Sequence, residues 1–292
     1  MSDTESVIST HSMEMRKRSR KTPQSPFSYF TLKDIKSTSH WDENTASTLN
    51  IKVKDSENII NTCSDLKFVE NAKELIIDEW KDENWLISVN VDNLNVSSKN
   101  KTIINKIKKV HLSMKYGEWK VEGFMNSIIN ALGFDDHPHY FYPNYECSVK
   151  IGTEEHEITS VSDFGVFHND RVFLIIENKT IDTARYNNSW KEHQVLGELF
   201  VSAHNVAMLR NVKYPIELYA LRVVGTLFTF YKSEVSIDYI KETLKGFPLN
   251  YEMEVLRHPP IGDSIVLQKY DYCSIDDRKK ILDIMCKIGS SL

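Results

Sequence analysis

The sequence has few cysteines, and they follow no pattern that would indicate a cross-linked or metal-bound scaffold. The 292 residues contain four of them, and none are paired at the C-x-x-C spacing of a zinc site. Four cysteines in a chain of this length do not form a disulfide framework. We therefore expect reduced thiols in an intracellular protein at Cys63, Cys147, Cys273 and Cys286.

Long hydrophobic runs are also missing. No apolar stretch approaches the roughly 18 residues needed to cross a bilayer. The N-terminal sequence MSDTESVIST has neither the charged start nor the apolar stretch of a signal peptide. From these absences we expect a protein of the nucleus or the cytoplasm, without a membrane partner.

The sequence contains neither a glycine-rich phosphate-binding loop nor a G-x-S-x-G motif, so an ATP-driven mechanism is disfavoured. An excess of positive charge is absent too, since the formal net charge is -5 at pH 7. The molecule as a whole therefore does not attract nucleic acid. A polyanionic partner would have to be held by a local basic patch.

The first part of the chain is polar, and Ser and Thr make up 17 of its first 50 residues. Because it shows no apolar periodicity, we interpret residues 1–45 as a disordered tail. The tail contains the basic cluster RKRSRK, in which Lys17, Arg18 and Arg20 are candidates for binding a nuclear import receptor. The same cluster could instead contact nucleic acid, or it could be a solvated patch without a partner.

Residues 46–100 are interpreted as an N-terminal extension or small subdomain, with a helix over 70–85 and a strand over 85–91. The next segment, KTIINKIKKVHLSMK, has apolar residues at helical spacing with lysines around them, which predicts an amphipathic helix. A solvated basic face is one explanation of these lysines, and phosphate binding is the other. The candidates for contacting nucleic acid here are Lys106, Lys108 and Lys109.

Residues 101–292 are assigned to one domain of mixed α/β class, with its core at 118–232. In YGEWKVEGFMNSIINALGF, apolar residues recur at i, i+3, i+4 and i+7, which predicts a helix that ends at Gly133. Three strands follow, in YECSVKI, EITSVSDFGVF and VFLIIENK, and the turn sequence HNDR joins the last two into a hairpin.

A second helix over 189–209 and a β-rich segment over 216–232, turned at Gly225, complete the core. The expected order is thus helix, strand, strand, strand, helix, strand. Two shorter helices are expected after it, near 237–245 and 275–288.

Polar residues collect at one edge of this expected sheet. Asp163 lies in the second strand, and Glu177 and Lys179 share a face at the end of the third, because side chains two apart in a strand point to the same side. Glu122 lies on the margin of the preceding helix, and Gln194 lies on the following one. Burying a carboxylate and an ammonium costs several kcal/mol each unless something compensates for it.

A hard divalent cation would compensate for the buried carboxylates. Mg²⁺, which Mn²⁺ could replace, prefers oxygen ligands. Lys179 would then position a metal-activated water or neutralise developing negative charge. The alternative is a plain salt bridge between Glu177 and Lys179 at a strand end where the pair is no longer buried. The candidate metal ligands are Asp163, Glu177, Glu122 and the backbone carbonyl of Asn178.

With these residues in place, segment 118–232 resembles the PD-(D/E)XK nuclease superfamily, which has the restriction-endonuclease-like fold. The element order is similar to its αβββαβ core. Asp163 matches the motif aspartate, Glu177-Asn178-Lys179 matches E-x-K, and Ser162 stands in place of the motif's proline. The stretch LRVVGTLFTFYK also looks like the nuclease domains of Crinkler-type effectors of fungi and oomycetes.

Two further positions carry the resemblance. Glu122 looks like the first-helix glutamate of Holliday-junction resolvases, and Gln194 resembles the glutamine that follows the E-x-K strand in RecB-like members. Glu198 stands where a tyrosine is common in those proteins.

The resemblance implies a metal-dependent nuclease that hydrolyses phosphodiester bonds, with DNA favoured over RNA. It implies Asp163, Glu177, Lys179 and Gln194 as catalytic residues, and Lys191 is a further candidate for contacting nucleic acid. The alternative is a degenerate nuclease fold that binds nucleic acid or a protein and cuts nothing. The sequence does not separate endonuclease from exonuclease action, and it leaves the oligomeric state open.

Overall fold

A computed structural model describes residues 31–35, 37–60, 65–112, 117–153, 156–182, 192–210, 212–261 and 269–291. The candidate import residues Lys17, Arg18 and Arg20, and the candidate Lys191, lie outside the described residues. The chain divides after Thr31 into two units, and the second, which begins at Leu32, contains the fold described below.

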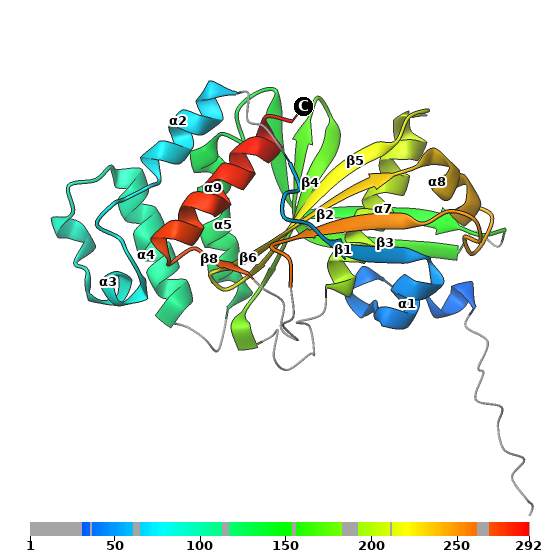
Figure 1. Ribbon diagram of the computed structural model, residues 1–292, viewed down its shortest axis with the longest axis horizontal. Helices are drawn as coiled ribbons and strands as arrows, with labels where there is room; N and C mark the ends of the chain where they lie inside the picture. The colour runs from blue at the N-terminus through cyan, green and yellow to red at the C-terminus, as the bar shows by residue number, and fades with distance from the viewer. Residues whose placement is uncertain are drawn as a thin grey trace, which may run out of the picture. The chain divides into compact units, whose positions relative to one another are not determined.

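Among the described residues, the centre of the fold is a mixed sheet of eight strands (Figure 1). The strands are β1 Ile51–Asp55, β2 His139–Ile151, β3 His156–His168, β4 Arg171–Lys179, β5 Ile216–Val224, β6 Leu227–Val235, β7 Met253–His258 and β8 Tyr270–Asp271. Seven lie in the order β1-β7-β6-β5-β4-β3-β2, and β8 pairs with β6. The pairs β1–β7 and β4–β5 are parallel, and the other neighbours are antiparallel.

Helices pack around this sheet. The described α-helices are α1 Glu43–Thr48, α2 Leu66–Glu74, α3 Glu83–Ser88, α4 Ser98–Leu112, α5 Glu118–Leu132, α7 His193–Arg210, α8 Ile237–Thr243 and α9 Ile275–Gly289, and the 3-10 helices are η1 Leu32–Asp34, η2 Thr38–His40 and η3 Val91–Asn93. Helix α7 packs against β2, β3, β4 and β5. Helix α5 contacts β4, and it also contacts the helices α2 and α4. Figure 1 shows α2, α4, α5 and α9 gathered in one group.

The predicted mixed α/β class and the order of the core elements are confirmed. Helix α5, strands β2, β3 and β4, helix α7 and strand β5 follow one another along the chain. Gly133 ends α5 with a φ of 94°, a left-handed conformation that glycine adopts without steric cost. Asn169 and Asp170 have positive φ in the turn between β3 and β4, and Gly225 has positive φ in the turn between β5 and β6.

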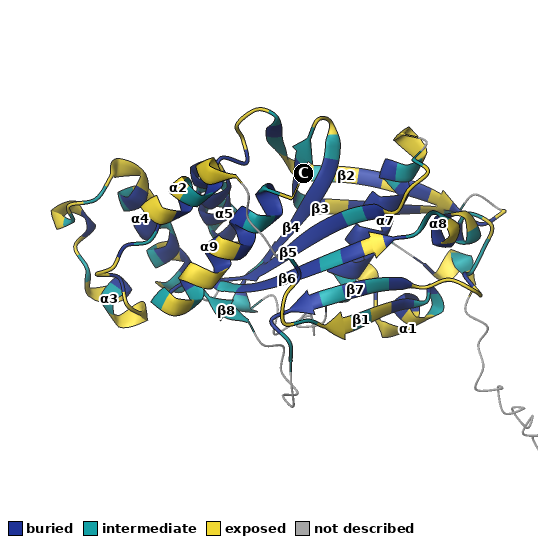
Figure 2. Ribbon diagram, turned by 45° about the horizontal axis from the view of Figure 1, so that its top comes forward, coloured by how far each residue is buried: buried dark blue, intermediate teal, exposed yellow. Residues whose placement is uncertain are grey.

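The apolar periodicity of the sequence explains the core. Phe124, Ile128 and Leu132 of α5 are fully buried, as are Phe164 of β3 and Ile176 of β4, and they belong to one cluster. Figure 2 shows β4 and β5 buried along their length, while the outer faces of the surrounding helices carry exposed residues. Strand β4 therefore combines a buried apolar body with a polar end.

Three local predictions are wrong. The helix expected over 70–85 is interrupted, because α2 ends at Glu74 and α3 begins at Glu83. The expected tail to residue 45 does not describe residues 32–45, because η1, η2 and the start of α1 form there and Ile35 and Trp41 are buried. The expected strand over 85–91 is mostly helix α3, whose first turn is capped by Asp82 through a 2.9 Å hydrogen bond from the backbone N of Trp85.

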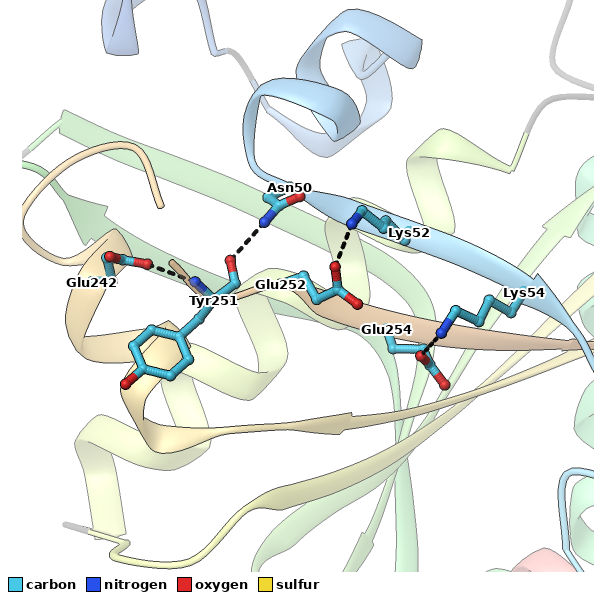
Figure 3. Close-up of polar contacts among 7 residues, drawn as sticks. All are labelled: Asn50, Lys52, Lys54, Glu242, Tyr251, Glu252 and Glu254. Carbon is cyan, nitrogen blue, oxygen red and sulfur yellow. Dashed lines mark hydrogen bonds and ion pairs between the residues drawn. The ribbon is translucent and has the colours of Figure 1, made fainter. Parts of the chain in front are cut away.

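Strand β1 is the outermost strand on one side of the sheet, and it pairs with β7 (Figure 3). Ion pairs join Lys52 to Glu252 and Lys54 to Glu254, and the amide of Asn50 donates to the carbonyl of Tyr251 at 2.7 Å. These exposed ion pairs contribute little stability. They connect side chains on the two strands, which are paired in parallel.

Within the described residues, none of the helices combines the length and the apolar character that a bilayer crossing requires.

Candidate functional site

The pairing of β3 with β4 sets Asp163 beside the end of β4. Phe164 pairs with Ile176, so Asp163 lies next to the point where Glu177 begins the polar end of the strand. Asp163 Oδ2 accepts a hydrogen bond from the backbone N of Asn178 at 2.5 Å. A buried backbone N–H needs a partner, and here the aspartate supplies it. This bond holds the carboxylate at a defined place beside the end of β4.

Glu177 and Lys179 point to the same face of β4 and form an ion pair. Lys179 Nζ lies 2.5 Å from Glu177 Oε1, and the exposed fractions of the two side chains are 18% and 3%. The salt bridge considered as an alternative is therefore present, but it is not exposed as that alternative expected, because Glu177 is buried and Lys179 is partly buried. Burial of two charges is costly unless geometry and further hydrogen bonds are favourable.

Helix α7 supplies those further hydrogen bonds. Gln194 Nε2 donates to Glu177 Oε1 at 2.6 Å and to Glu198 Oε1 at 3.0 Å. One amide thus bridges a strand carboxylate and a helix carboxyl group, because Gln194 and Glu198 lie one turn apart on α7. Gln194 was expected in the site from its position after β4, and its side chain is in direct contact with Glu177.

The acidic groups of the site have shifted pKa values. Burial, followed by the charge of Glu177, raises the pKa of Asp163 to about 7. Burial and the same neighbour raise the pKa of Glu198 well above its usual value. Both pKa values rise mainly because burial disfavours the charged form of a carboxyl group, and repulsion from Glu177 adds to the effect.

The pKa of Lys179 moves upward. Burial lowers this pKa, but the charges of Glu177, Glu118 and Asp163 outweigh burial. The ammonium group is therefore charged at neutral pH, and it offsets part of the negative charge around it.

Sequence reasoning missed Glu118. This residue begins α5, is exposed, and raises the pKa of Asp163 and of Lys179 through its charge. Glu122 lies one turn later on the same helix and is half-buried. The i, i+4 spacing puts both glutamates on one side of α5. That spacing is a signal that could have added Glu118 to the candidates.

A network of ion pairs anchors the start of α7. Glu192 Oε1 lies 2.6 Å from Arg257 Nη1, and Arg257 Nη2 lies 2.6 Å from Asp55 Oδ1. These residues come from the beginning of the helix, from β7 and from β1. These contacts hold the N-terminal end of α7, where Gln194 lies. Because the three residues are far apart in the sequence, no local sequence pattern predicts the network.

The donor set is suited to a hard divalent cation, although it is sparse. Asp163 and Glu177 provide carboxylate oxygens close to the end of β4. A bound cation would offset the repulsion between these two carboxylates. Among the described residues, no group of three or more His, Cys, Asp or Glu has an arrangement that could hold a metal ion. Mg²⁺ usually binds through one or two carboxylates and keeps several waters, so a site with two carboxylates is consistent with Mg²⁺.

The lysines of α4 are mostly engaged within the protein. Lys106 Nζ donates to the carbonyl of Gly123 at 2.9 Å and to Ser127 Oγ at 2.6 Å, so it ties α4 to α5. Lys108 Nζ donates to the carbonyl of Val89 at 2.9 Å. Lys109 is exposed. The contacts of Lys106 and Lys108 indicate structural roles, and phosphate binding by Lys109 stays a prediction.

No protein-family model matches the chain, and a comparison with curated proteins found none with significant similarity.

Proposed function

We propose that the protein is a divalent-metal-dependent nuclease with a restriction-endonuclease-like core, and that it hydrolyses phosphodiester bonds in nucleic acid, with DNA favoured over RNA. The observation that carries this proposal is the convergence of Asp163, in the interior of β3, with Glu177 and Lys179 at the end of the neighbouring strand β4. The element order from α5 to β5 and the parallel pairing of β4 with β5 support the same core.

In this proposal each residue of the site has a separate role. Gln194 holds Glu177 in place, and the backbone N of Asn178 holds Asp163. Lys179, which is charged, stabilises the negative charge that develops on the phosphoryl oxygens. Because its pKa is raised, Lys179 serves as a cation and not as a general base. Mg²⁺ or Mn²⁺, when bound, would polarise the phosphate and lower the pKa of a bound water.

A catalytically degenerate fold that binds nucleic acid or a protein is the second candidate. It is favoured by the short contact between Lys179 and Glu177, since Glu177 Oε1 already accepts from both Lys179 and Gln194. In a degenerate fold, Lys179 would itself compensate for the charge of Glu177, as a bound metal ion would in an active nuclease.

The test is hydrolysis of labelled DNA and RNA in Mg²⁺, in Mn²⁺ and in EDTA, with wild type and Asp163→Ala. The nuclease proposal expects cleavage that requires metal and is lost in the variant. Calorimetry with Mn²⁺ separates the two candidates: binding at millimolar metal supports the nuclease. Absence of both binding and cleavage supports the degenerate fold.

A further inference from the structure

A cavity of about 210 Å³ adjoins the candidate site. Thr180, which directly follows Lys179, lines it on one side together with Gly225. Gly225 is tied to the end of β4, because its backbone N donates to the carbonyl of Lys179 at 2.8 Å. Gly117 also lines the cavity and immediately precedes Glu118. The cavity thus lies next to the end of β4, which carries Glu177 and Lys179, and to the start of α5, which carries Glu118.

The lining of the cavity suits a neutral ring better than a phosphate. The charge of Lys120 is offset by the carboxyl groups of Glu83 and Asp271, so the lining does not favour an anion. Val121 adds an apolar wall. Pockets for drug-sized ligands usually exceed about 300 Å³, so this one suits a smaller group with polar edges and apolar faces. A nucleobase has this chemistry.

An exposed tryptophan, Trp119, lies beside the lining residues Gly117 and Lys120, although it does not itself line the cavity. Trp119 is 67% exposed although it is among the largest apolar side chains of the protein. Its indole lies over Gly117, where an added Cβ would come within 2.7 Å of the indole nitrogen and where φ is +112°. Lys120 Nζ lies 5.3 Å from the ring centroid. The glycine leaves room for the ring, and the ring remains open to solvent.

We propose that Trp119 and this cavity form a nucleobase site that binds one base of a single-stranded segment beside the bond to be cut. This inference rests on the proposed nuclease function. Bases within a duplex are paired and stacked, so a base can enter such a cavity only from a single strand or after it leaves the stack. Aromatic stacking is tolerant of sequence because each base has a π face.

The first experiment measures binding in EDTA, where metal-dependent cleavage does not occur. Fluorescence anisotropy compares a labelled single-stranded oligonucleotide with an all-abasic strand of the same length, so that the phosphate backbone is identical. The expected result is that wild type binds the base-bearing strand about tenfold more tightly, as base–aromatic stacking predicts. Trp119→Ala should bind both strands equally, and Trp119→Phe should recover most of the preference.

Two further variants sharpen the test. Tyr214→Ala removes an aromatic side chain that is 60% exposed but precedes β5, at the sheet end opposite Lys179, and it should keep the preference. Leu227→Phe places a ring into the cavity that Leu227 lines, and it should weaken the preference while Trp119 remains. Circular dichroism of each variant checks that it is folded.

The outcomes separate this inference from the nuclease proposal. A wild-type protein without base preference, or a preference unchanged in Trp119→Ala, overturns the base site even if the protein cuts DNA in Mg²⁺. A preference that depends on Trp119 supports the base site even if neither DNA nor RNA is cut, and in that case the nuclease proposal fails alone.

Discussion

Lys179 Nζ lies 2.5 Å from Glu177 Oε1 in a buried ion pair at the end of β4. A buried pair of this kind differs from a surface pair in what happens when one partner is removed. The remaining charge stays in a medium of low polarity, and the desolvation cost is no longer offset. At the surface, water replaces the lost partner.

Removing the lysine charge should therefore destabilise the fold. We expect Lys179→Met to lower the free energy of unfolding by roughly 3 kcal/mol in metal-free buffer at pH 8, because Glu177 is left buried without its ion partner. Lys52→Met is the matched control. Its partner Glu252 is exposed, so the loss should stay below about 1 kcal/mol. Urea unfolding measures both, and equal losses would contradict the argument.

The raised pKa of Asp163 predicts a pH dependence of stability. Its folded pKa of about 7 exceeds the ordinary aspartate pKa of 3.8, so the folded state binds more protons between those values. Stability from this group is therefore present at low pH and is lost as pH rises from about 4 through 7. Asp163→Asn should flatten this dependence and stabilise the metal-free protein above pH 7. Unfolding midpoints measured from pH 5 to 8 check the sign, and a steeper slope in the variant would refute it.

The two glutamates of α5 should differ in their effect on the site. The charge of Glu118 raises the pKa of Asp163, so Glu118→Gln should lower that pKa. It should also weaken binding of Mn²⁺ if Glu118 contributes to the negative field. Glu122→Gln, one turn later on the same helix, is the control and should change the pKa less. NMR titration of the Asp163 carboxyl group measures both variants, and equal shifts would remove Glu118 from the site.

Asn178 gives a prediction of increased stability. Its side chain is 1% exposed, and neither Oδ1 nor Nδ2 has a hydrogen-bond partner among the described residues. An unsatisfied buried amide costs about 1–3 kcal/mol. Asn178→Val, whose side chain is well suited to a strand, should therefore raise the free energy of unfolding by about 1 kcal/mol. Thermal unfolding tests this, and a lower midpoint would indicate that the amide has a partner.

The basic cluster near the N-terminus supports a proposal about location. Lys17, Arg18 and Arg20 have the spacing of a short nuclear import signal. We expect a fluorescent fusion lacking residues 1–25, made too large for passive diffusion, to be excluded from nuclei. Continued nuclear accumulation would contradict the import proposal. A fall in DNA affinity with a smaller salt dependence would instead assign the cluster to phosphate contacts.

Much of the core could be predicted from the sequence because its signals are local. The 3.6-residue spacing in α5 and the apolar run of β4 each depend on residues close together in the chain. The same holds for the turn between β3 and β4 and for Gly133 at the end of α5. The candidate group of Asp163, Glu177 and Lys179 also followed from strand periodicity, since a hairpin brings its two strands together.

Some features depended on contacts that are distant in sequence. Strand β1 carries a single buried residue, Ile51, and it is a strand because it pairs with β7 about 200 residues later. The helical turns before residue 45 form where Trp41 packs against Phe200 of α7. Such pairings leave no local periodicity to detect.

The sequence alone determined which side chains were available at the site, and it placed Glu177 and Lys179 on one face of a strand. The tertiary structure decided which partners meet them. The position of α5 brings the charge of Glu118 to Asp163, and the position of α7 lets Gln194 bridge Glu177 and Glu198. Helix periodicity defines the direction of a side chain relative to its own axis, but the place of that axis over the sheet comes from packing of the whole core.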